Sequence, residues 1–191
     1  NDGKIYQYWL DNNLFASIPN ENTPFITLLP PLNVTGVAHI GHAFNCTQQD
    51  ILMRYHKLKG YNTLFIPGVD HAGLATQNVV EKELAKQKTT RHQLGREKFT
   101  DELNKWMNIK HDIIVSQLKS LGCAFDWSRE QFTMNEHFSK LVLQTFVKLY
   151  NDELIYKGKY IINWCPRCST ALADDEVEER DTNSKLYYIK Y

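Results

Sequence analysis

The sequence predicts an α/β fold with a doubly wound parallel sheet, and three segments carry this prediction. A continuous apolar run of strand length occupies residues 25–29, and residues 62–66 are predicted to be a second strand. Runs without polar alternation are typical of strands that are buried on both faces of a parallel sheet. Between them, apolar residues recur at helical spacing from Val37 to Leu58, and Gly60 follows at the position of a helix C′ glycine. Strand, helix and strand in this order make a βαβ unit.

Local signals delimit the beginning and the end of these elements. An amphipathic spacing of apolar residues predicts a short helix over residues 4–15. Pro30–Pro31 and Pro67–Gly68 are expected to end the two strands, because proline cannot donate to a central ladder. Thr35–Gly36 is expected to be the turn and cap of the long helix.

The second half of the chain reads as helical additions followed by a short strand-rich segment. Residues 75–121 are predicted to be mostly helical, with breaks near 88–90 and at Gly95, and residues 135–151 predict a further helix. Residues 160–164 have strand-like composition, and residues 185–191 alternate as a strand does.

Composition predicts a soluble globular chain. The 191 residues are 42% apolar and 12% aromatic, which is enough for a hydrophobic core. The 22 Lys and Arg balance 22 Asp and Glu, so the net charge of zero gives no argument for bulk attraction to nucleic acid or membranes. No apolar run approaches the roughly 18 residues of a membrane span. The chain lacks a starting Met and a signal sequence, and we expect it to be part of a longer protein.

The charged and thiol side chains indicate which kinds of partner and which compartment to expect. Basic residues between positions 82 and 98 alternate with glutamates, which favours a solvated helix face over contact with nucleic acid. Cys165 and Cys168 form a C-x-x-C pair, whereas Cys46 and Cys123 stand alone, a pattern typical of reduced thiols in a cytosol-like compartment. The pair is open to three interpretations: half of a zinc site, a redox dithiol, or two free thiols.

The segment from Pro30 to His42 holds the strongest candidate site. It joins the end of a predicted strand to the start of a helix, where α/β sheets bind nucleotides and where free N–H groups attract phosphate. His39 and His42 are three residues apart and can reach the same anion, while Gly41 lets a flat group approach the backbone. Core packing and metal ligation are the alternatives for the two histidines, and spacing alone does not decide between them.

Residues 39–42 spell the HIGH signature, and on this motif the chain resembles the class I aminoacyl-tRNA synthetases. Within that family the valyl-tRNA synthetases are the most similar, and the resemblance covers nearly the whole chain. Its other motifs are Pro30–Gly36, Gly68–Gln77, Thr90–His92, Gly95–Glu97, Asp126–Trp127 and Asn163–Pro166. Leu32 replaces a third proline and Val69 a threonine of the family pattern, but neither change removes a catalytic side chain.

The resemblance implies a role for each residue of the first motif. His39 and His42 would be the catalytic pair that stabilises charge on the phosphates during attack of an amino-acid carboxylate on the α-phosphate of ATP. Gly41 and Asn45 would complete the ATP site. ATP with Mg²⁺ would therefore be a substrate.

The same resemblance implies that three other residues bind the amino-acid substrate. Pro31 through its carbonyl, Asn33 and Asp70 would bind valine, with Asp70 paired to the ammonium group. Without the resemblance, Asp70 also reads as a turn residue that is hydrogen-bonded to its own loop. Its place at the end of the second predicted strand favours the binding role.

The resemblance also implies what the chain represents. Residues 1–160 would be the N-terminal half of a Rossmann-like catalytic domain, and residues 161–191 a zinc-knuckle-like segment that leads to an editing insertion. The KMSKS loop, most of the editing domain and the anticodon-binding domain would lie outside the chain, which alone should be a weak enzyme. The implied whole is a monomeric, cytoplasmic or organellar valine–tRNA ligase. Its partner would be tRNA(Val), and zinc would be held in part by Cys165 and Cys168.

Three alternative functions stay open from the sequence. An isoleucyl or leucyl enzyme is the nearest alternative within the family, and the Asp70 motif argues against both. A nucleotidyltransferase for small phosphates would not need that motif or the cysteine pair. A non-catalytic nucleotide-binding module is the third alternative, against which the intact histidines count.

Overall fold

The computed structural model describes residues 2–191, the side chain of Asp2 excepted. The chain forms two compact units, of which the first ends at Thr145 and the second is Phe146–Tyr191. The functional division expected at residues 160/161 is a different one and stays a proposal. Across residues 2–191, no helix has both the length and the apolar composition that crossing a membrane requires.

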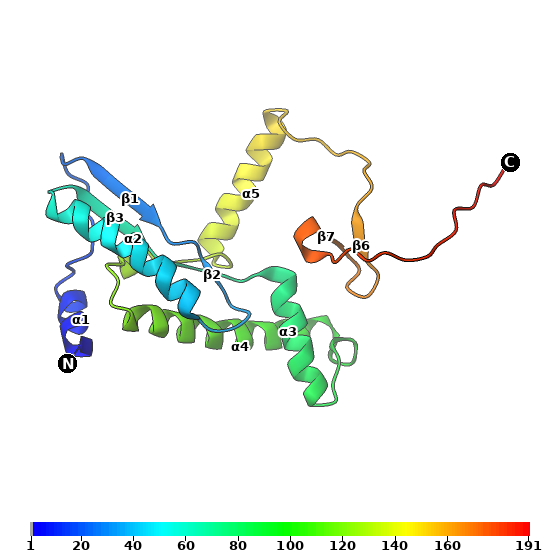
Figure 1. Cartoon of the computed structure of the whole chain (residues 1–191), viewed down its shortest axis with the longest axis horizontal. Coiled ribbons are helices and arrows are strands. Elements are labelled where there is room, and N and C mark those ends of the chain that lie inside the picture. The colour runs from blue at the N-terminus through cyan, green and yellow to red at the C-terminus, as the bar shows by residue number, and fades with distance from the viewer. Residues whose placement is uncertain (1) are drawn as a thin grey trace. The chain divides into compact units, whose positions relative to one another are not determined.

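The predicted βαβ unit is confirmed. It consists of β1 (Pro24–Leu28), α2 (Ile40–Leu58) and β3 (Asn62–Ile66), and β1 pairs with β3 in parallel over its whole length. Figure 1 shows α2 running beside this strand pair. Gly60 has a φ of 85° just after the helix, which confirms its role as the C′ glycine.

The expectation of strands buried on both faces is wrong for β1. Its residues alternate between exposed and half-buried, and the side chains of Ile26 and Leu28 are 60% and 66% exposed. One face of the β1·β3 pair packs against α2, and the pair is a two-stranded sheet. Among the described residues, nothing covers the other face of β1, so the apolar side chains on that face remain exposed.

The prolines separate the two-stranded β1·β3 sheet from a second sheet. After them β2 (Leu32–Asn33), β4 (Gly68–Asp70) and β5 (Gln131–Phe132) form a second parallel sheet in the order β2-β4-β5. The prediction that the two strands end at the prolines is confirmed, since β1 ends at Leu28 and β3 ends at Ile66. Pro67 sits between the two ladders, where only its carbonyl is used, as acceptor for the N–H of Gln131.

The helices agree with the sequence pattern. They are α1 (Asp2–Asp11), α3 (Gly73–Lys86), α4 (Arg91–Ser120) and α5 (Glu136–Asn151), with short 3₁₀ turns at Trp127–Arg129 and Asp174–Glu176. The first helix stops at Asp11 rather than at residue 15. Both predicted breaks are confirmed, since residues 88–90 separate α3 from α4 and Gly95 interrupts α4. Its φ of 76° and ψ of 171° lie in a region that is nearly restricted to glycine.

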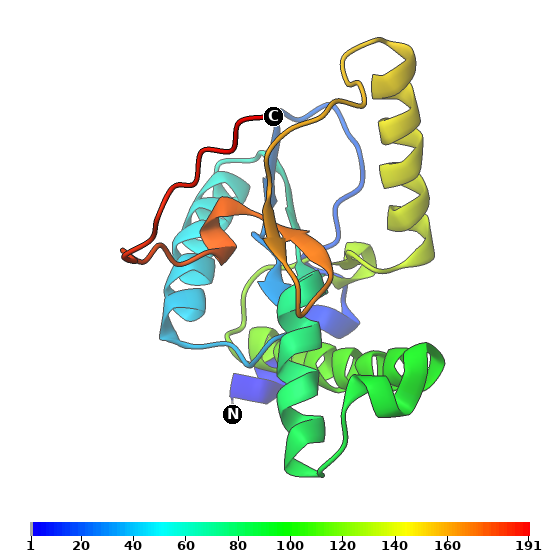
Figure 2. The ribbon, with the colours of Figure 1, turned by 90° about the vertical axis from the view of Figure 1, so that its right-hand side faces the viewer.

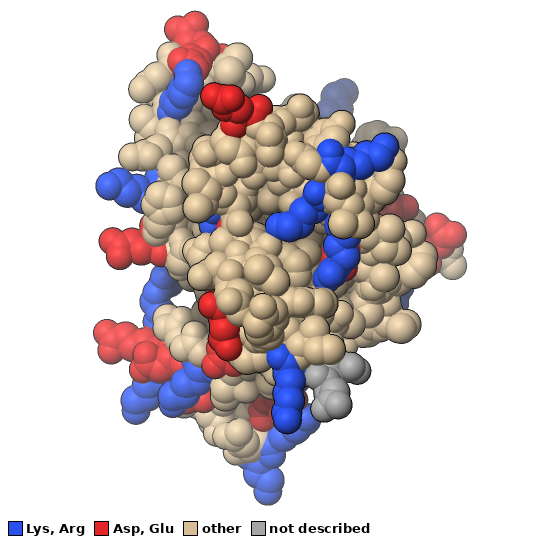
Figure 3. Space-filling model, turned by 90° about the vertical axis from the view of Figure 1, so that its left-hand side faces the viewer, with Lys and Arg blue, Asp and Glu red and all other residues tan. Residues whose placement is uncertain are grey.

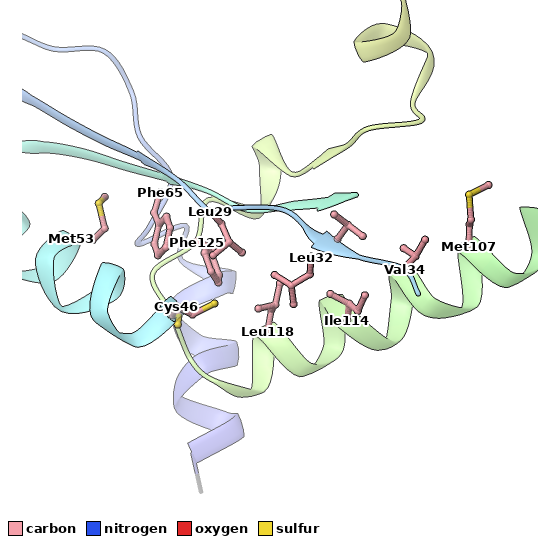
Figure 4. Close-up of a cluster of buried hydrophobic side chains, with 12 residues drawn as sticks. Leu29, Leu32, Val34, Cys46, Met53, Phe65, Met107, Ile114, Leu118 and Phe125 are labelled. Carbon is pink, nitrogen blue, oxygen red and sulfur yellow. The ribbon is translucent and has the colours of Figure 1, made fainter. Parts of the chain in front are cut away.

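The main core lies between the strands, α2 and α4. Figure 4 shows Phe65 of β3, Cys46 and Met53 of α2, and Ile114 and Leu118 of α4 within one cluster of buried side chains. This packing fixes α4 against the segment that joins β1 to α2. Burial raises the pKa of the Cys46 thiol to about 11 and that of the Cys123 thiol to about 12, so both stay protonated, as expected for structural cysteines.

The charged surface supports the interpretation of the basic run as a solvated helix face. Lys86 pairs with Glu83 at 2.7 Å, and Arg91 pairs with Glu81 at 3.1 Å. On the face shown in Figure 3, Lys and Arg side chains are interspersed with Asp and Glu. Local ion pairs thus use up part of the positive charge that a nucleic acid would need.

The second unit contains a small antiparallel hairpin. β6 (Asn163–Cys165) pairs with β7 (Thr170–Leu172), and Figure 2 shows the two strands side by side. The strand expected over 160–164 therefore begins only at Asn163. The strand expected over 185–191 does not form, because this alternating segment has no neighbouring strand to pair with among residues 2–191.

Candidate functional site

The two histidines of residues 39–42 cap the helix that follows them. His39 is the N-cap residue, with φ −122° and ψ 176°, and its Nδ1 accepts the N–H of Gly41 at 3.1 Å. In return, Nδ1 of His42 accepts the N–H of His39 at 3.1 Å. The expectation that Thr35–Gly36 caps the helix is wrong, because an imidazole nitrogen provides the acceptor that Ser, Thr or Asp usually supplies.

This reciprocal cap fixes which nitrogen of each ring is free. Both Nδ1 atoms accept a backbone N–H, so each neutral ring carries its proton on Nε2. The ring centroids of His39 and His42 lie 3.9 Å apart. Burial, together with the neighbouring His39, lowers the pKa of His42, which favours its neutral form. The helix N-terminus therefore presents two adjacent N–H donors, as binding of a phosphate requires.

Gly41 has a structural reason to lack a side chain. A Cβ at this position would lie 3.0 Å from Cε1 and 3.1 Å from Nδ1 of His39, so it would push the capping ring away. Close approach of a flat ligand, as expected from the sequence, is compatible with this geometry. Asn45 lies one turn further along α2, is exposed, and accepts a hydrogen bond from Gln49.

Two side chains of α4 hold the segment before the histidines. The indole N–H of Trp106 donates to the carbonyl of Val34 at 2.9 Å, and Oε1 of Gln117 accepts the N–H of Ala38 at 2.9 Å. The segment that carries His39 is thus fixed at both ends by one helix. Neither residue could be predicted as part of the site, because on a long helix both look like ordinary packing and surface positions.

The predicted amino-acid residues meet at the end of the second sheet. Asn33 on β2 stands opposite Asp70 on β4, and the N–H of Val34 donates to the carbonyl of Asp70 at 2.9 Å. Pro31 directly precedes β2. A Cβ at Gly68 would lie 3.5 Å from the Cβ of Pro31, so the glycine permits this close approach. The structure therefore brings all three predicted residues to one sheet edge.

Only one oxygen of the Asp70 carboxylate accepts hydrogen bonds from the described part of the chain. Its Oδ1 accepts the N–H of Ala72 at 3.1 Å and the hydroxyl of Thr133 at 3.0 Å. The contact with Ala72 is the turn hydrogen bond of the structural interpretation, so Asp70 does stabilise its own loop. In residues 2–191, no group donates to Oδ2, which leaves one carboxylate oxygen for a ligand. The contact with Thr133 could not be predicted from the sequence, because the two residues lie 63 positions apart along the chain.

Cys165 and Cys168 lie in the β6–β7 hairpin. The N–H of Cys168 donates to Sγ of Cys165 at 3.4 Å, and this hydrogen bond is the main cause of the lowered pKa of the Cys165 thiol. The two thiols can therefore supply two of the four ligands that a soft, tetrahedrally bound cation takes. No cluster of three or more His, Cys, Asp or Glu side chains that could hold a metal occurs within residues 2–191.

Comparisons with known proteins agree with this geometry. The sequence model of the family described as "tRNA synthetases class I (I, L, M and V)" matches residues 4–190. The valine–tRNA ligase of Desulfotalea psychrophila is 55% identical over 184 residues, which cover 96% of this chain and 21% of that protein. The valine–tRNA ligase of Thermotoga maritima is 50% identical over 189 residues, which cover 98% of this chain and 22% of that protein. The chain thus spans about a fifth of the length of these relatives.

One solved structure shows the same fold. A ternary complex of the agnB2 LeuRS of Agrobacterium radiobacter K84 with tRNA and LeuAMS matches with a TM-score of 0.74 and 25% identity. The match covers 91% of this chain and 20% of that one. It confirms the predicted Rossmann-like α/β class, which the parallel β1·β3 pair with its crossover helix already indicates.

Proposed function

The chain belongs to the family of class I tRNA synthetases, and we propose that it forms the ATP- and valine-binding part of a valine–tRNA ligase. The arrangement that carries the proposal is the pair of free imidazole Nε2 atoms at the start of α2, joined by a short segment to the strand ends that hold Asn33 and Asp70. The whole enzyme would be a longer polypeptide, called the full-length enzyme below.

In the first reaction step, an oxygen of the valine carboxylate forms a bond to the α-phosphorus of ATP. The bond from that phosphorus to the bridging oxygen breaks, and pyrophosphate leaves with the electron pair. No proton has to be moved, so positioning and charge stabilisation are what the protein supplies. The Nε2–H groups of His39 and His42 would donate to the phosphate oxygens on which charge increases. ATP would enter as its Mg²⁺ complex.

On the amino-acid side, Oδ2 of Asp70 would pair with the ammonium group of valine. The carbonyl of Pro31 would accept a second ammonium N–H, and Asn33 would bind beside them. The valyl group would then pass from the adenylate to tRNA(Val). Isoleucyl and leucyl specificity are not favoured, because the relatives named above, at 50–55% identity, are valine–tRNA ligases.

A thermal-shift titration of the chain with a non-hydrolysable valyl-adenylate tests the function. Binding to the folded state should raise the Tm by mass action. The valyl and threonyl analogues should both raise it and the isoleucyl analogue should not, because a small pocket excludes an added methylene better than an isosteric hydroxyl. The shift should disappear in His42→Ala and Asp70→Ala. Preference for the isoleucyl analogue would contradict valine specificity, and no shift even with the full-length enzyme would contradict the proposed function.

We also propose that Cys165 and Cys168 supply two thiolate ligands to a zinc ion whose other ligands lie outside this chain. When bound, zinc would stabilise the hairpin fold. Purified full-length enzyme should contain one equivalent more zinc, measured by plasma mass spectrometry, than its Cys165→Ser variant. Cys123→Ser, which replaces a thiol buried in the other unit, is the matched control and should keep the metal. Equal zinc in wild type and Cys165→Ser would exclude the site.

The remaining assignments of the whole enzyme follow from the resemblance to the synthetase family described above. We propose tRNA(Val) as its macromolecular partner, a monomeric state, and a cytoplasmic location with an organellar one as the alternative. Gel filtration and cell fractionation test the last two directly.

A further inference from the structure

The hydroxyl of Thr133 is the meeting point of three polar groups beside the proposed valine site. It lies 3.0 Å from Oδ1 of Asp70, 2.9 Å from the backbone nitrogen of His71, and 2.6 Å from Nδ1 of His71. The backbone holds it there, since Thr133 continues the β4·β5 ladder and its own N–H donates to the carbonyl of Val69 at 3.2 Å. Strand pairing therefore places this hydroxyl next to the residues that follow β4.

The three contacts admit one consistent assignment of protons. A hydroxyl has one hydrogen to donate and two lone pairs to accept with. The ionised carboxylate of Asp70 can only accept, so the hydroxyl hydrogen points to it. The N–H of His71 then takes one lone pair, and the contact at 2.6 Å requires a second donor, which is Nδ1–H of His71. The neutral ring of His71 therefore keeps its proton on Nδ1 and has a free acceptor at Nε2.

The surrounding backbone makes this arrangement rigid. Ala72 has a φ of 53°, in the left-handed region that a residue with a side chain rarely adopts, and its N–H donates to the same Oδ1 of Asp70. The hydroxyl of the buried Thr76 donates to the carbonyl of His71 at 2.6 Å. The segment from Asp70 to Ala72 is thus held from β5 on one side and from α3 on the other.

We propose that Thr133 is a positioning residue for valine binding, a role that rests on the proposed function of the site. By occupying Oδ1 of Asp70, its hydroxyl turns Oδ2 toward the ammonium group of the amino acid. By accepting Nδ1–H, it fixes the His71 ring with its Nε2 lone pair available to a donor, such as a further N–H of that ammonium group. Thr133 itself touches no reacting atom in this arrangement.

Valine-dependent ATP–pyrophosphate exchange by the full-length enzyme tests the role. Thr133→Val keeps the shape of the side chain and removes the hydroxyl, and it should raise the KM for valine about tenfold because a hydrogen bond to a charged group is lost. The KM for ATP should stay unchanged. Thr133→Ser keeps the hydroxyl and should restore the wild-type KM. Because Thr133 acts through Asp70, Thr133→Val combined with Asp70→Asn should be no worse than Asp70→Asn alone.

The outcomes separate this inference from the proposed function. Failure of the wild-type enzyme to exchange with valine would overturn the proposed function. An unchanged KM for valine in Thr133→Val, in an enzyme where Asp70→Asn raises it, would overturn the role of Thr133 alone. The proton assignment has its own measurement, which needs no variant: ¹⁵N NMR of the imidazoles should show His71 as the Nδ1–H form above pH 8. An Nε2–H form would overturn the proposed network.

Discussion

Replacing His42 with alanine in the full-length enzyme is expected to lower kcat for valine-dependent ATP–pyrophosphate exchange about 10²–10³-fold, because one preorganised donor to the phosphates is lost. The ring is held in place before ATP binds, since its Nδ1 already accepts the N–H of His39 at 3.1 Å. Its Nε2–H therefore needs no reorientation during the reaction, which is the condition under which such donors contribute most.

The structure allows two explanations of that loss, and one further variant distinguishes them. Alanine removes both the Nε2–H donor and the acceptor that caps the helix. His42→Asn keeps a side-chain acceptor near the N–H of His39 but has no donor where Nε2 lies. If the donor is what matters, Asn should be as slow as Ala, whereas recovery in Asn would show that the cap alone was responsible. His92→Ala, an exposed position on α4, is the matched control and should keep wild-type kcat.

The part of the fold that could be predicted is the part with long periodic signals. The βαβ unit, both breaks around α4 and the C′ glycine at position 60 follow from apolar runs, helical spacing and glycine geometry. The second sheet could not be predicted, because strands of two or three residues have no period to detect, and prolines stand directly before β2 and β4. Residues 185–191 show the opposite case. Their alternating pattern predicts a strand, but no strand forms there because the segment has no partner strand among residues 2–191.

The candidate site residues follow from motifs in the sequence, whereas the residues that support them could not be predicted. His39, His42, Asn33 and Asp70 lie in two short segments whose residue types point to their chemistry. Thr133, by contrast, reaches Asp70 from 63 residues away, and its type is common in any strand. His39 shows a different limit, because histidine is not among the usual N-cap residues and sequence rules therefore place the cap at Thr35 instead. Only the fold shows that His39, for which we propose a catalytic role, is also the residue that caps the helix.

Asp70→Asn is expected to raise the KM for valine in the full-length enzyme about 10- to 100-fold, with little change in the KM for ATP. The charge-assisted hydrogen bond to the ammonium group contributes roughly 1.5–3 kcal/mol, and Asn offers only a neutral acceptor. Steady-state exchange kinetics with valine and ATP varied separately measure both constants.

This substitution also decides between the two interpretations of Asp70, because it removes the charge and keeps the turn. The carbonyl oxygen of Asn can still accept the N–H of Ala72 and the hydroxyl of Thr133, so thermal unfolding should occur at nearly the wild-type temperature. Asp70→Ala loses both acceptors, leaves the left-handed Ala72 unsupported, and should lower the Tm as well. A residue needed only for the turn would show the opposite pattern, with Asn wild-type in KM and Ala affected through stability alone. A raised KM in a stable Asp70→Asn enzyme would show that the carboxylate itself meets the substrate, since both hydrogen bonds that Oδ1 of Asp70 accepts are ones that an amide oxygen can reproduce.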